Sequence, residues 1–256
     1  MTTNRLSADF LATDGKEQLL VYKLHERIKA FTTTAAVGRD ADKLCPLLGV
    51  PTSRFARPHQ VHTTNVLQID EAFMALDEEE RKARMEGIDA VIYDVRNACI
   101  GISTADCIPV VCYDPIHHVA AAIHAGWRGT VERIAIKAIE AMSLAYSTTP
   151  ADLLCAIGPG ISYHSFEVGD EVYEAFRNSR FNMETLAGKH PSTDPAQPMK
   201  WHINLHECNR QQLCEAGVKA ENIYVSDLDT MTDDRFFSAR RDGAKTGRML
   251  TGIVLM

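Results

Sequence analysis

The chain has 256 residues, 45% of them hydrophobic and 24% charged, which is typical of a soluble globular protein with one large domain or two small ones. The net charge of −7 argues against a general nucleic-acid-binding or anionic-membrane surface, but it allows a local cationic pocket. We find no apolar run of about 18 residues and no signal peptide, so we expect a cytoplasmic protein with no membrane partner.

The N-terminal part of the chain predicts short strands followed by a helix. Strands are expected at Leu19 to Val21 and around Phe31. A short helix is predicted from Asp40 to Leu48, because Gly49 follows it and a proline lies just beyond.

The segment from Glu71 to Arg84 is rich in charge. Glu78 and Lys82 stand at helical i,i+4 spacing, as do Glu80 and Arg84, which favours ion pairs along one helix face. We interpret the segment as a solvated helix or loop.

The middle of the chain holds four apolar runs that are short and rich in small or β-branched residues, which predicts buried strands. After the last of them, Thr130 is the expected N-cap of an amphipathic helix that reaches about Ala145. The four strands are predicted at residues 89–93, 98–103, 109–113 and 119–124.

The C-terminal part alternates further strands and helices. The stretch from Gly188 to Met199 carries three prolines among polar residues and is predicted to be a surface loop. Because strands follow one another closely and helices are inserted unevenly, we expect an α+β fold with a mixed sheet and a single domain over residues 1–256. The other expected elements are strands at 153–157 and 248–255, a helix beginning at 170–176, and a helix at 206–216 closed by Gly217.

Three short segments, 58–62, 104–107 and 123–130, carry residue types that suggest chemistry. Cys107 follows one predicted strand and His124 ends another, so both are well placed to face a cleft. A cysteine thiolate and two imidazoles form a ligand set that zinc favours, and three protein ligands leave its fourth position open for water or substrate.

The histidine that completes this set is left open by the spacing alone. His59 and His62 form a His-x-x-His pair, of which only one could reach a shared site from a strand, and we favour His62. His117 and His118 follow a turn and are expected to meet solvent. Taken singly, a histidine at a strand end is more often structural, and Cys107 alone is more often a small core residue.

Three arginines are candidates for an anion pocket, because a guanidinium offers a fixed fork to phosphate or carboxylate. Arg128 precedes a predicted helix, and Arg240 and Arg241 lie beside two phenylalanines. Pairing of Arg240 or Arg241 with Asp234 or Asp242 is the equally weighted alternative. The sequence contains neither a phosphate-binding glycine loop nor a Gly-x-Ser-x-Gly elbow.

Together these segments resemble the YfiH family, also called the laccase-domain or polyphenol-oxidase-like family. The matching motifs appear in the family's order from about residue 20 to 255. They are Gln60-Val61-His62, Thr104-Ala105-Asp106-Cys107-Ile108-Pro109-Val110, His124-Ala125-Gly126-Trp127-Arg128-Gly129, Ile157-Gly158-Pro159, Phe166-Glu167-Val168-Gly169, Trp201-His202-Ile203-Asn204-Leu205 and Phe237-Ser238-Ala239-Arg240-Arg241-Asp242-Gly243.

The resemblance implies a four-layer α/β/β/α fold and a zinc-dependent enzyme acting on a purine nucleoside and phosphate. It implies phosphorolysis of adenosine, inosine and methylthioadenosine, and deamination of adenosine. The metal site falls on His62, Cys107 and His124. For catalysis we add Arg128, and the further candidates for binding substrate or phosphate are Arg240, Arg241, Glu167 and Asp106. The oligomeric state is left open.

Two departures from the family pattern bear on the metal. Many relatives carry Cys-Cys where this chain has His164-Ser165, and Cys-Thr near Asp229-Thr230. With fewer soft ligands, copper is the second choice after zinc. The alternative functions are a cysteine hydrolase of peptidoglycan-precursor peptides, with Cys107 as nucleophile and His124 as base, then a copper polyphenol oxidase, and last a non-catalytic binding module.

Overall fold

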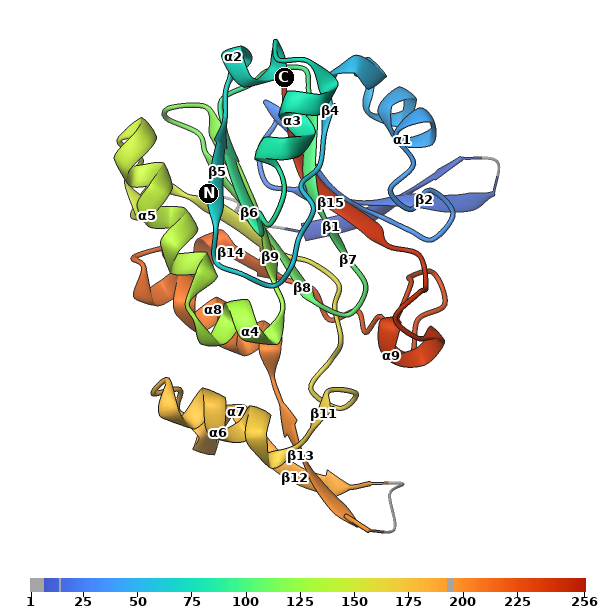
Figure 1. Cartoon of the computed structure of the whole chain (residues 1–256), viewed down its shortest axis with the longest axis vertical. Helices are drawn as coiled ribbons and strands as arrows, with labels where there is room; N and C mark the ends of the chain where they lie inside the picture. Colours follow the sequence, from blue (N-terminus) through green and yellow to red (C-terminus); the bar gives the residue numbers. More distant parts are fainter. Residues whose placement is uncertain (1–6, 14, 193–195) are drawn as a thin grey trace, which may run out of the picture.

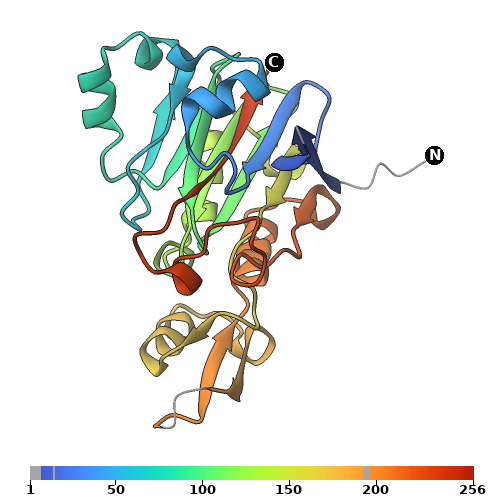
Figure 2. The ribbon, with the colours of Figure 1, turned by 90° about the vertical axis from the view of Figure 1, so that its right-hand side faces the viewer.

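Two six-stranded mixed sheets form the centre of the molecule in a computed structural model that describes residues 7–13, 15–192 and 196–256. Figures 1 and 2 show the sheets stacked face to face. In the first sheet only β4 and β7 run parallel. Its order is β1 (Ser7–Thr13), β2 (Lys16–Lys23), β3 (Ile28–Thr33), β15 (Met249–Leu255), β7 (Cys99–Thr104) and β4 (Phe55–Ala56).

The second sheet is antiparallel at its centre and parallel at both edges. Its strands β6, β8 and β9 are buried along their whole length, which explains why the sequence presents them as apolar runs without alternation. The order is β14 (Ile223–Val225), β10 (Leu154–Ile157), β8 (Ile108–Asp114), β9 (Val119–Ala125), β6 (Ala90–Tyr93) and β5 (Val66–Ile69).

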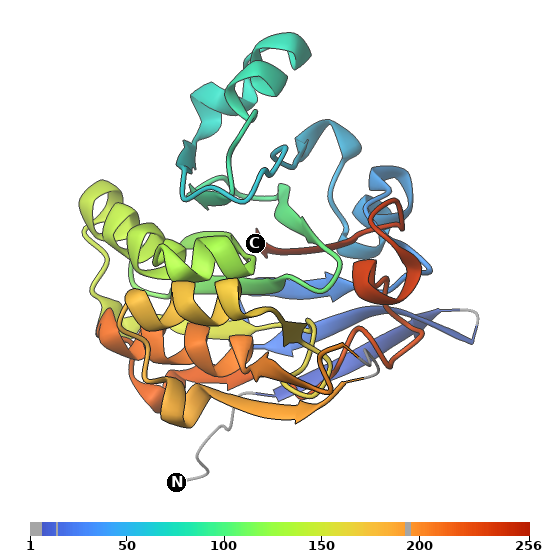
Figure 3. The ribbon, with the colours of Figure 1, turned by 60° about the horizontal axis from the view of Figure 1, so that its bottom comes forward.

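Helices cover the outer faces of both sheets. Leu44 and Leu48 of α1 (Ala41–Leu48) share a buried cluster with Phe31 of the first sheet. On the outer face of the second sheet lie α5 (Ile134–Tyr146) and α8 (Leu205–Glu215), as Figure 3 shows. A third cluster, which includes Tyr93, fills the space between the sheets. The α+β class with mixed sheets is confirmed, and the layers follow the order α/β/β/α.

A smaller lobe extends from one end of the sheets (Figure 1). It contains a three-stranded sheet and two helices, and Trp201 stacks on Tyr173 with ring centroids 3.8 Å apart. Val172 and Phe176 join the same buried cluster as the second sheet, so apolar packing continues from the body into the lobe. The elements are β11 (Glu167–Val168), β13 (Met199–Ile203), β12 (Ala187–Pro191), α6 (Asp170–Asn178) and α7 (Met183–Leu186).

Helix boundaries follow the capping signals in the sequence. The carboxylate of Asp40 accepts hydrogen bonds from the backbone of Asp42 and Lys43 at the start of α1, and Gly49 ends that helix with φ of +73°. Gly217, with φ of +101°, follows α8 in the same way. In the described part of the chain, every helix is too short or too polar to span a bilayer.

The predicted N-cap at Thr130 is wrong. The helix there is divided into α4 (Trp127–Val131), which begins after Gly126, and α5, which begins after Arg133. Thr130 lies inside α4, fully buried, and its hydroxyl contacts Ala125 and Asn209. The division follows from the left-handed backbone of Arg133, with φ of +65°.

The predicted surface loop from Gly188 to Met199 is wrong at its two ends, which belong to the β12–β13 hairpin, with Lys189 opposite Trp201. Residues 192 and 196–198 lie outside both strands, in agreement with the prediction. Residues 193–195 lie outside the described part of the chain. Prolines do not exclude this hairpin, because a proline is tolerated at the end of an edge strand.

His118 is buried, contrary to the expectation that it meets solvent. Its ring lies 2.9 Å from the Tyr113 hydroxyl and 3.1 Å from the Met256 carbonyl. His117 is exposed, as expected, and contacts Asp114. Burial lowers the pKa of His118, which suits a neutral structural residue.

The charged segment from residue 71 to 84 forms two helices, α2 (Glu71–Met74) and α3 (Glu78–Arg84). In the described structure the expected ion pairs along α3 are absent. Arg54, in the short 3-10 helix η1 (Thr52–Arg54), instead binds Glu71 with nitrogen–oxygen distances of 2.6 and 3.1 Å. The remaining short elements are η2 (Pro150–Asp152), η3 (Ala220–Asn222) and α9 (Ala239–Asp242).

Candidate metal centre

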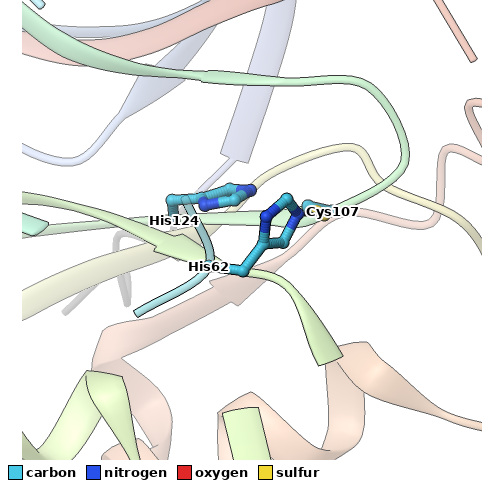
Figure 4. A group of neighbouring side chains, drawn as sticks. All are labelled: His62, Cys107 and His124. Carbon is cyan, nitrogen blue, oxygen red and sulfur yellow. Dashed lines mark hydrogen bonds between the residues drawn. The ribbon is translucent and has the colours of Figure 1, made fainter. Parts of the chain in front are cut away.

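His62, Cys107 and His124 converge at one end of the second sheet, as Figure 4 shows. Their ligand atoms all lie within 4.8 Å of one another, and Cys107 Sγ is 3.8 Å from His62 Nε2. Bond lengths at tetrahedral zinc place sulfur and nitrogen ligands about 3.5 Å apart. Among the residues that the structure describes, these three side chains form the one group of His, Cys, Asp or Glu that could hold a metal ion.

The three ligands lie in different elements and differ in how far they are exposed. His124 is buried at the end of β9, Cys107 is half-buried just before β8, and His62 is exposed on the loop after β4. Since one ligand faces solvent, the site is open on one side. An open side is what a catalytic metal position requires and a structural one does not.

Asp89 holds two of the ligands in place, and its side chain is fully buried. Its carboxylate accepts hydrogen bonds from His124 Nδ1 at 2.7 Å and from the backbone N–H of His62 at 3.0 Å. Bonds from Val61 and from the backbone and hydroxyl of Thr63 complete the set. A carboxylate only accepts, so His124 carries a proton on Nδ1 and directs Nε2 to the site.

This network also fixes the charges. Burial would raise the pKa of Asp89, but the hydrogen bonds from His124 and Thr63 outweigh it and hold that pKa well below its usual range. Burial would likewise raise the pKa of the Cys107 thiol, and the two imidazoles, His124 first, lower it to about 6. Burial would lower the pKa of His124, but the thiolate of Cys107 and the carboxylate of Asp89 outweigh it and raise that pKa to about 9. Without an ion the site therefore holds a thiolate beside a protonated His124, and a metal ion that binds there would displace the Nε2 proton.

Two residues of the motifs serve the packing of the site. A Cβ at Gly126 would lie 2.9 Å from His62 Cδ2 and 3.1 Å from Cys107 Sγ, so only glycine fits against both ligands. Gln60 pairs with the backbone of Ser103 on β7 through two hydrogen bonds, of 2.8 and 2.7 Å. That pairing fixes the loop on which His62 is carried with φ of +65°.

A cavity of about 340 Å³ opens beside the thiolate. Its walls are mostly apolar, with the indole of Trp127 and the ring of Phe166 among them, and Arg240 at its edge. Pockets of this size and character are typical of small-molecule sites.

Asp106 builds the wall of that cavity. One carboxylate oxygen accepts from the Thr230 hydroxyl and the other from the Arg240 backbone N–H, both at 2.7 Å. With φ of +79°, Asp106 turns the chain between β7 and the cysteine. It therefore joins the loop of Cys107 to α9, and both of its oxygens are engaged in doing so.

The other predicted site residues are placed differently. Arg240 lies 5.8 Å above the Phe166 ring, whereas Arg241 binds its neighbour Asp242. Arg128 is exposed, with its guanidinium 4.2 Å from the Trp127 ring. Glu167 pairs with Lys200 in the lobe and does not line the cavity.

His59 lies apart from the metal ligands. Its ring contacts Glu86 at 2.6 Å on the surface, so the preference for His62 agrees with the geometry. The sequence reasoning missed Asp89, Gln60 and the aromatic walls. The sequence did offer one signal for Asp89. A carboxylate at the start of an apolar strand is expected to be buried, and a buried acid needs hydrogen-bond partners.

Comparison with known proteins places the chain in a family. The family model described as "Multi-copper polyphenol oxidoreductase laccase" matches residues 29–256. The chain is 42% identical to a protein of Bacteroides thetaiotaomicron named purine nucleoside phosphorylase, over 77% of this chain and 72% of that protein. It is 39% identical to a prokaryotic protein named adenosine deaminase RL5, over 93% and 97% respectively.

Solved structures agree with these matches. The crystal structure of the Bacillus licheniformis hypothetical protein YfiH superposes with a TM-score of 0.80 and 25% identity, covering 93% of this chain and 97% of the other. YlmD from Geobacillus stearothermophilus gives a TM-score of 0.81 at 26% identity, with coverages of 97% and 99%. The chain therefore belongs to the laccase-domain family, whose fold is that of YfiH and YlmD.

Proposed function

We propose that this protein is a zinc-dependent purine nucleoside enzyme that phosphorolyses adenosine, inosine and methylthioadenosine and deaminates adenosine. The observation that carries the proposal is the open-sided group of His62, Cys107 and His124 at the wall of an aromatic-lined cavity. The names of two relatives, a purine nucleoside phosphorylase and an adenosine deaminase, support the substrate class.

Zinc fits the donor set better than copper clusters do. One thiolate and two imidazoles, one of them oriented by a buried carboxylate, form a three-ligand zinc site. A multi-copper oxidase needs many more histidine and cysteine ligands than the one converging group in the described structure. When bound, zinc supplies Lewis-acid chemistry at its open position.

The cavity suits a purine nucleoside in shape and character. Trp127 and Phe166 offer aromatic faces to a planar base. We assign the ribose to the part of the cavity beside Cys107, where the bond between C1′ and the purine nitrogen is broken. In phosphorolysis a phosphate oxygen bonds to C1′ and the purine leaves with the electron pair. In deamination water adds at C6 and ammonia leaves.

Arg240 is our first choice for binding phosphate. It lines the cavity, and most of its guanidinium N–H groups make no described hydrogen bond. Asp106 positions Arg240 through the backbone N–H. Arg128 is exposed beside Trp127 and is assigned to a phosphate that enters from solvent. Arg241 and Glu167 are held in ion pairs outside the cavity, and we assign them no direct contact with substrate.

The test is metal analysis of protein purified without added metal, followed by turnover of adenosine with and without phosphate. We expect about one zinc per chain and release of adenine only with phosphate. Cys107→Ala should abolish both nucleoside reactions together. Cys214→Ala, a half-buried cysteine in α8, is the matched control and should keep both. Deamination that persists at the normal rate in Cys107→Ala would show that the two reactions do not share this site.

A second candidate function is a cysteine hydrolase acting on an amide such as a peptidoglycan-precursor peptide. The lowered pKa of Cys107, with two imidazoles beside it, favours this chemistry. The two functions separate on chelation: a cysteine hydrolase keeps its activity without metal and forms a covalent Cys107 adduct, whereas the nucleoside enzyme loses activity.

We further propose that residues 1–256 act as one domain in the cytoplasm, with small molecules rather than nucleic acids as partners. The apolar packing that joins lobe and body supports the first part. Limited proteolysis of the purified chain tests the single domain, and fractionation of cells tests the location in the cytoplasm.

A further inference from the structure

A second and larger cavity, of about 860 Å³, lies between the β4 edge of the first sheet and α3. In Figure 1, α3 lies next to β4. This cavity shares no lining residue with the cavity beside the metal ligands. The mechanism proposed above makes no use of it.

The walls of this cavity are cationic in an acidic protein. Arg39, Arg57, Arg81 and Lys82 line it, against the carboxylates of Glu78 and Glu86, a net charge of +2. One of these carboxylates, that of Glu86, contacts the ring of His59 at 2.6 Å.

The cations lack the partners that surface arginines usually have. In the part of the chain that the structure describes, no carboxylate lies within ion-pair distance of any of the four. The Nε atoms of Arg57 and Arg81 are buried and make no hydrogen bond. Nearby Arg54 also has a buried Nε without a partner, but it differs in its terminal nitrogens, which Glu71 neutralises through two hydrogen bonds.

Such unsatisfied donors are unfavourable. A buried N–H group that has lost its hydrating water and has gained no protein acceptor raises the free energy of the folded state. Arg39 and Arg57 also lie close enough to repel one another, and burial together with this repulsion lowers the pKa of Arg57. An anion between the guanidinium groups would satisfy the donors and remove the repulsion.

We infer that the cavity lined by Arg39, Arg57, Arg81 and Lys82 is a binding site for a nucleoside monophosphate, separate from the metal centre. The forked guanidinium groups match phosphate oxygens. The volume lies in the range of small-molecule pockets and far exceeds what a bare phosphate fills. Phe55 and Met85 provide half-buried apolar surface for a base.

The experiment is calorimetric titration of the full-length chain with AMP. We expect Arg57→Gln and Arg81→Gln each to weaken AMP binding at this site at least tenfold. Arg84→Gln is the matched control, because Arg84 lies on the same helix but does not line the cavity, and it should change the affinity less than twofold. Trp127→Ala, in the other cavity, should leave this binding intact.

Two further ligands and one further variant complete the test. Adenosine should not bind at this site and inorganic phosphate should bind at least tenfold more weakly than AMP. Lys82→Gln, an exposed position, gives a second variant should Arg57→Gln melt early. The inference is overturned if AMP binding is unchanged in Arg81→Gln, if Arg84→Gln weakens it equally, if only Trp127→Ala removes it, or if phosphate binds as tightly as AMP.

Discussion

The loop from residue 57 to 62 carries residues of two sites that differ in how their polar groups are satisfied. His62 belongs to the metal centre, where Asp89 accepts hydrogen bonds from the loop backbone and from His124. Arg57 and His59 belong to the cationic cavity, where Arg57 Nε has no partner. A metal site needs ligands held in one orientation before the ion arrives, whereas an anion site keeps its donors free for the ligand.

Asp89→Asn should have the largest effect. The amide keeps the shape of the side chain but loses the charge and cannot accept all five hydrogen bonds now directed at the carboxylate. We expect zinc affinity to fall about 10- to 100-fold and the free energy of unfolding to fall by about 3 kcal/mol. Competition with a zinc indicator and urea denaturation measure the two losses. Unchanged zinc affinity would contradict the orienting role of Asp89.

Gly126→Ala tests how tightly the ligands are packed. The added methyl would press on His62 and Cys107. These two side chains must then move, because the backbone of Gly126 is held at the start of α4. We expect about a tenfold loss of zinc affinity, the order of loss that disturbed ligand positioning gives, while the thermal midpoint of the metal-free chain changes little. A variant that binds zinc normally would show that the ligands have room to spare.

Asp229→Asn compares the buried Asp89 with a half-buried carboxylate. Asp229 accepts four hydrogen bonds, from the backbone and hydroxyl of Ser162, the hydroxyl of Ser165 and the backbone of Met231. Burial would raise its pKa, but these bonds outweigh burial and lower it. The folded state therefore favours the ionised group, and the stabilisation is complete above about pH 5 and is lost as pH falls below about 4.

The measurement for Asp229→Asn is urea denaturation at several pH values. We expect the wild type to be more stable than the variant by about 1 kcal/mol at pH 7, and the difference to shrink as pH falls below about 4. Asp227→Asn, an exposed neighbour, is the control and should show no such dependence. A stability difference that stays constant with pH would contradict the role assigned to the ionised carboxyl.

Glu86→Gln should have the smallest effect and acts on the cationic cavity alone. Removing this carboxylate leaves the four cations with less opposing charge. Because the group is exposed, we expect AMP to bind only about threefold more tightly, with a stronger dependence on salt. Zinc affinity should not change. Weaker AMP binding in this variant would argue that Glu86 contacts the ligand.

Several elements could be predicted from local sequence because local physics decides them. The cap formed by Asp40 and the left-handed turn at Gly49 are set by neighbours in the chain, and so are the fully buried strands β8 and β9. Prediction failed where a distant contact dominates. Thr130 resembles an N-cap, but it lies within a short helix against Asn209. The two ends of the proline-rich stretch join a hairpin whose strand β13 packs on α6 through the stacking of Trp201 on Tyr173.

The sequence by itself determined the kinds of ligand and the family motifs: a cysteine and two histidines beside strand ends, with glycines where backbone comes close. Only the tertiary structure decided that Asp89 holds His62 and His124 together, that Asp106 supports Arg240 rather than facing the metal ligands, and that four cations share one cavity. The reason is that most of these contacts join residues that are about 20 or more positions apart in the sequence. Such residues meet only when the strands pair and the sheets pack. The chemical type of each side chain is known from the sequence, whereas its contacts depend on the fold.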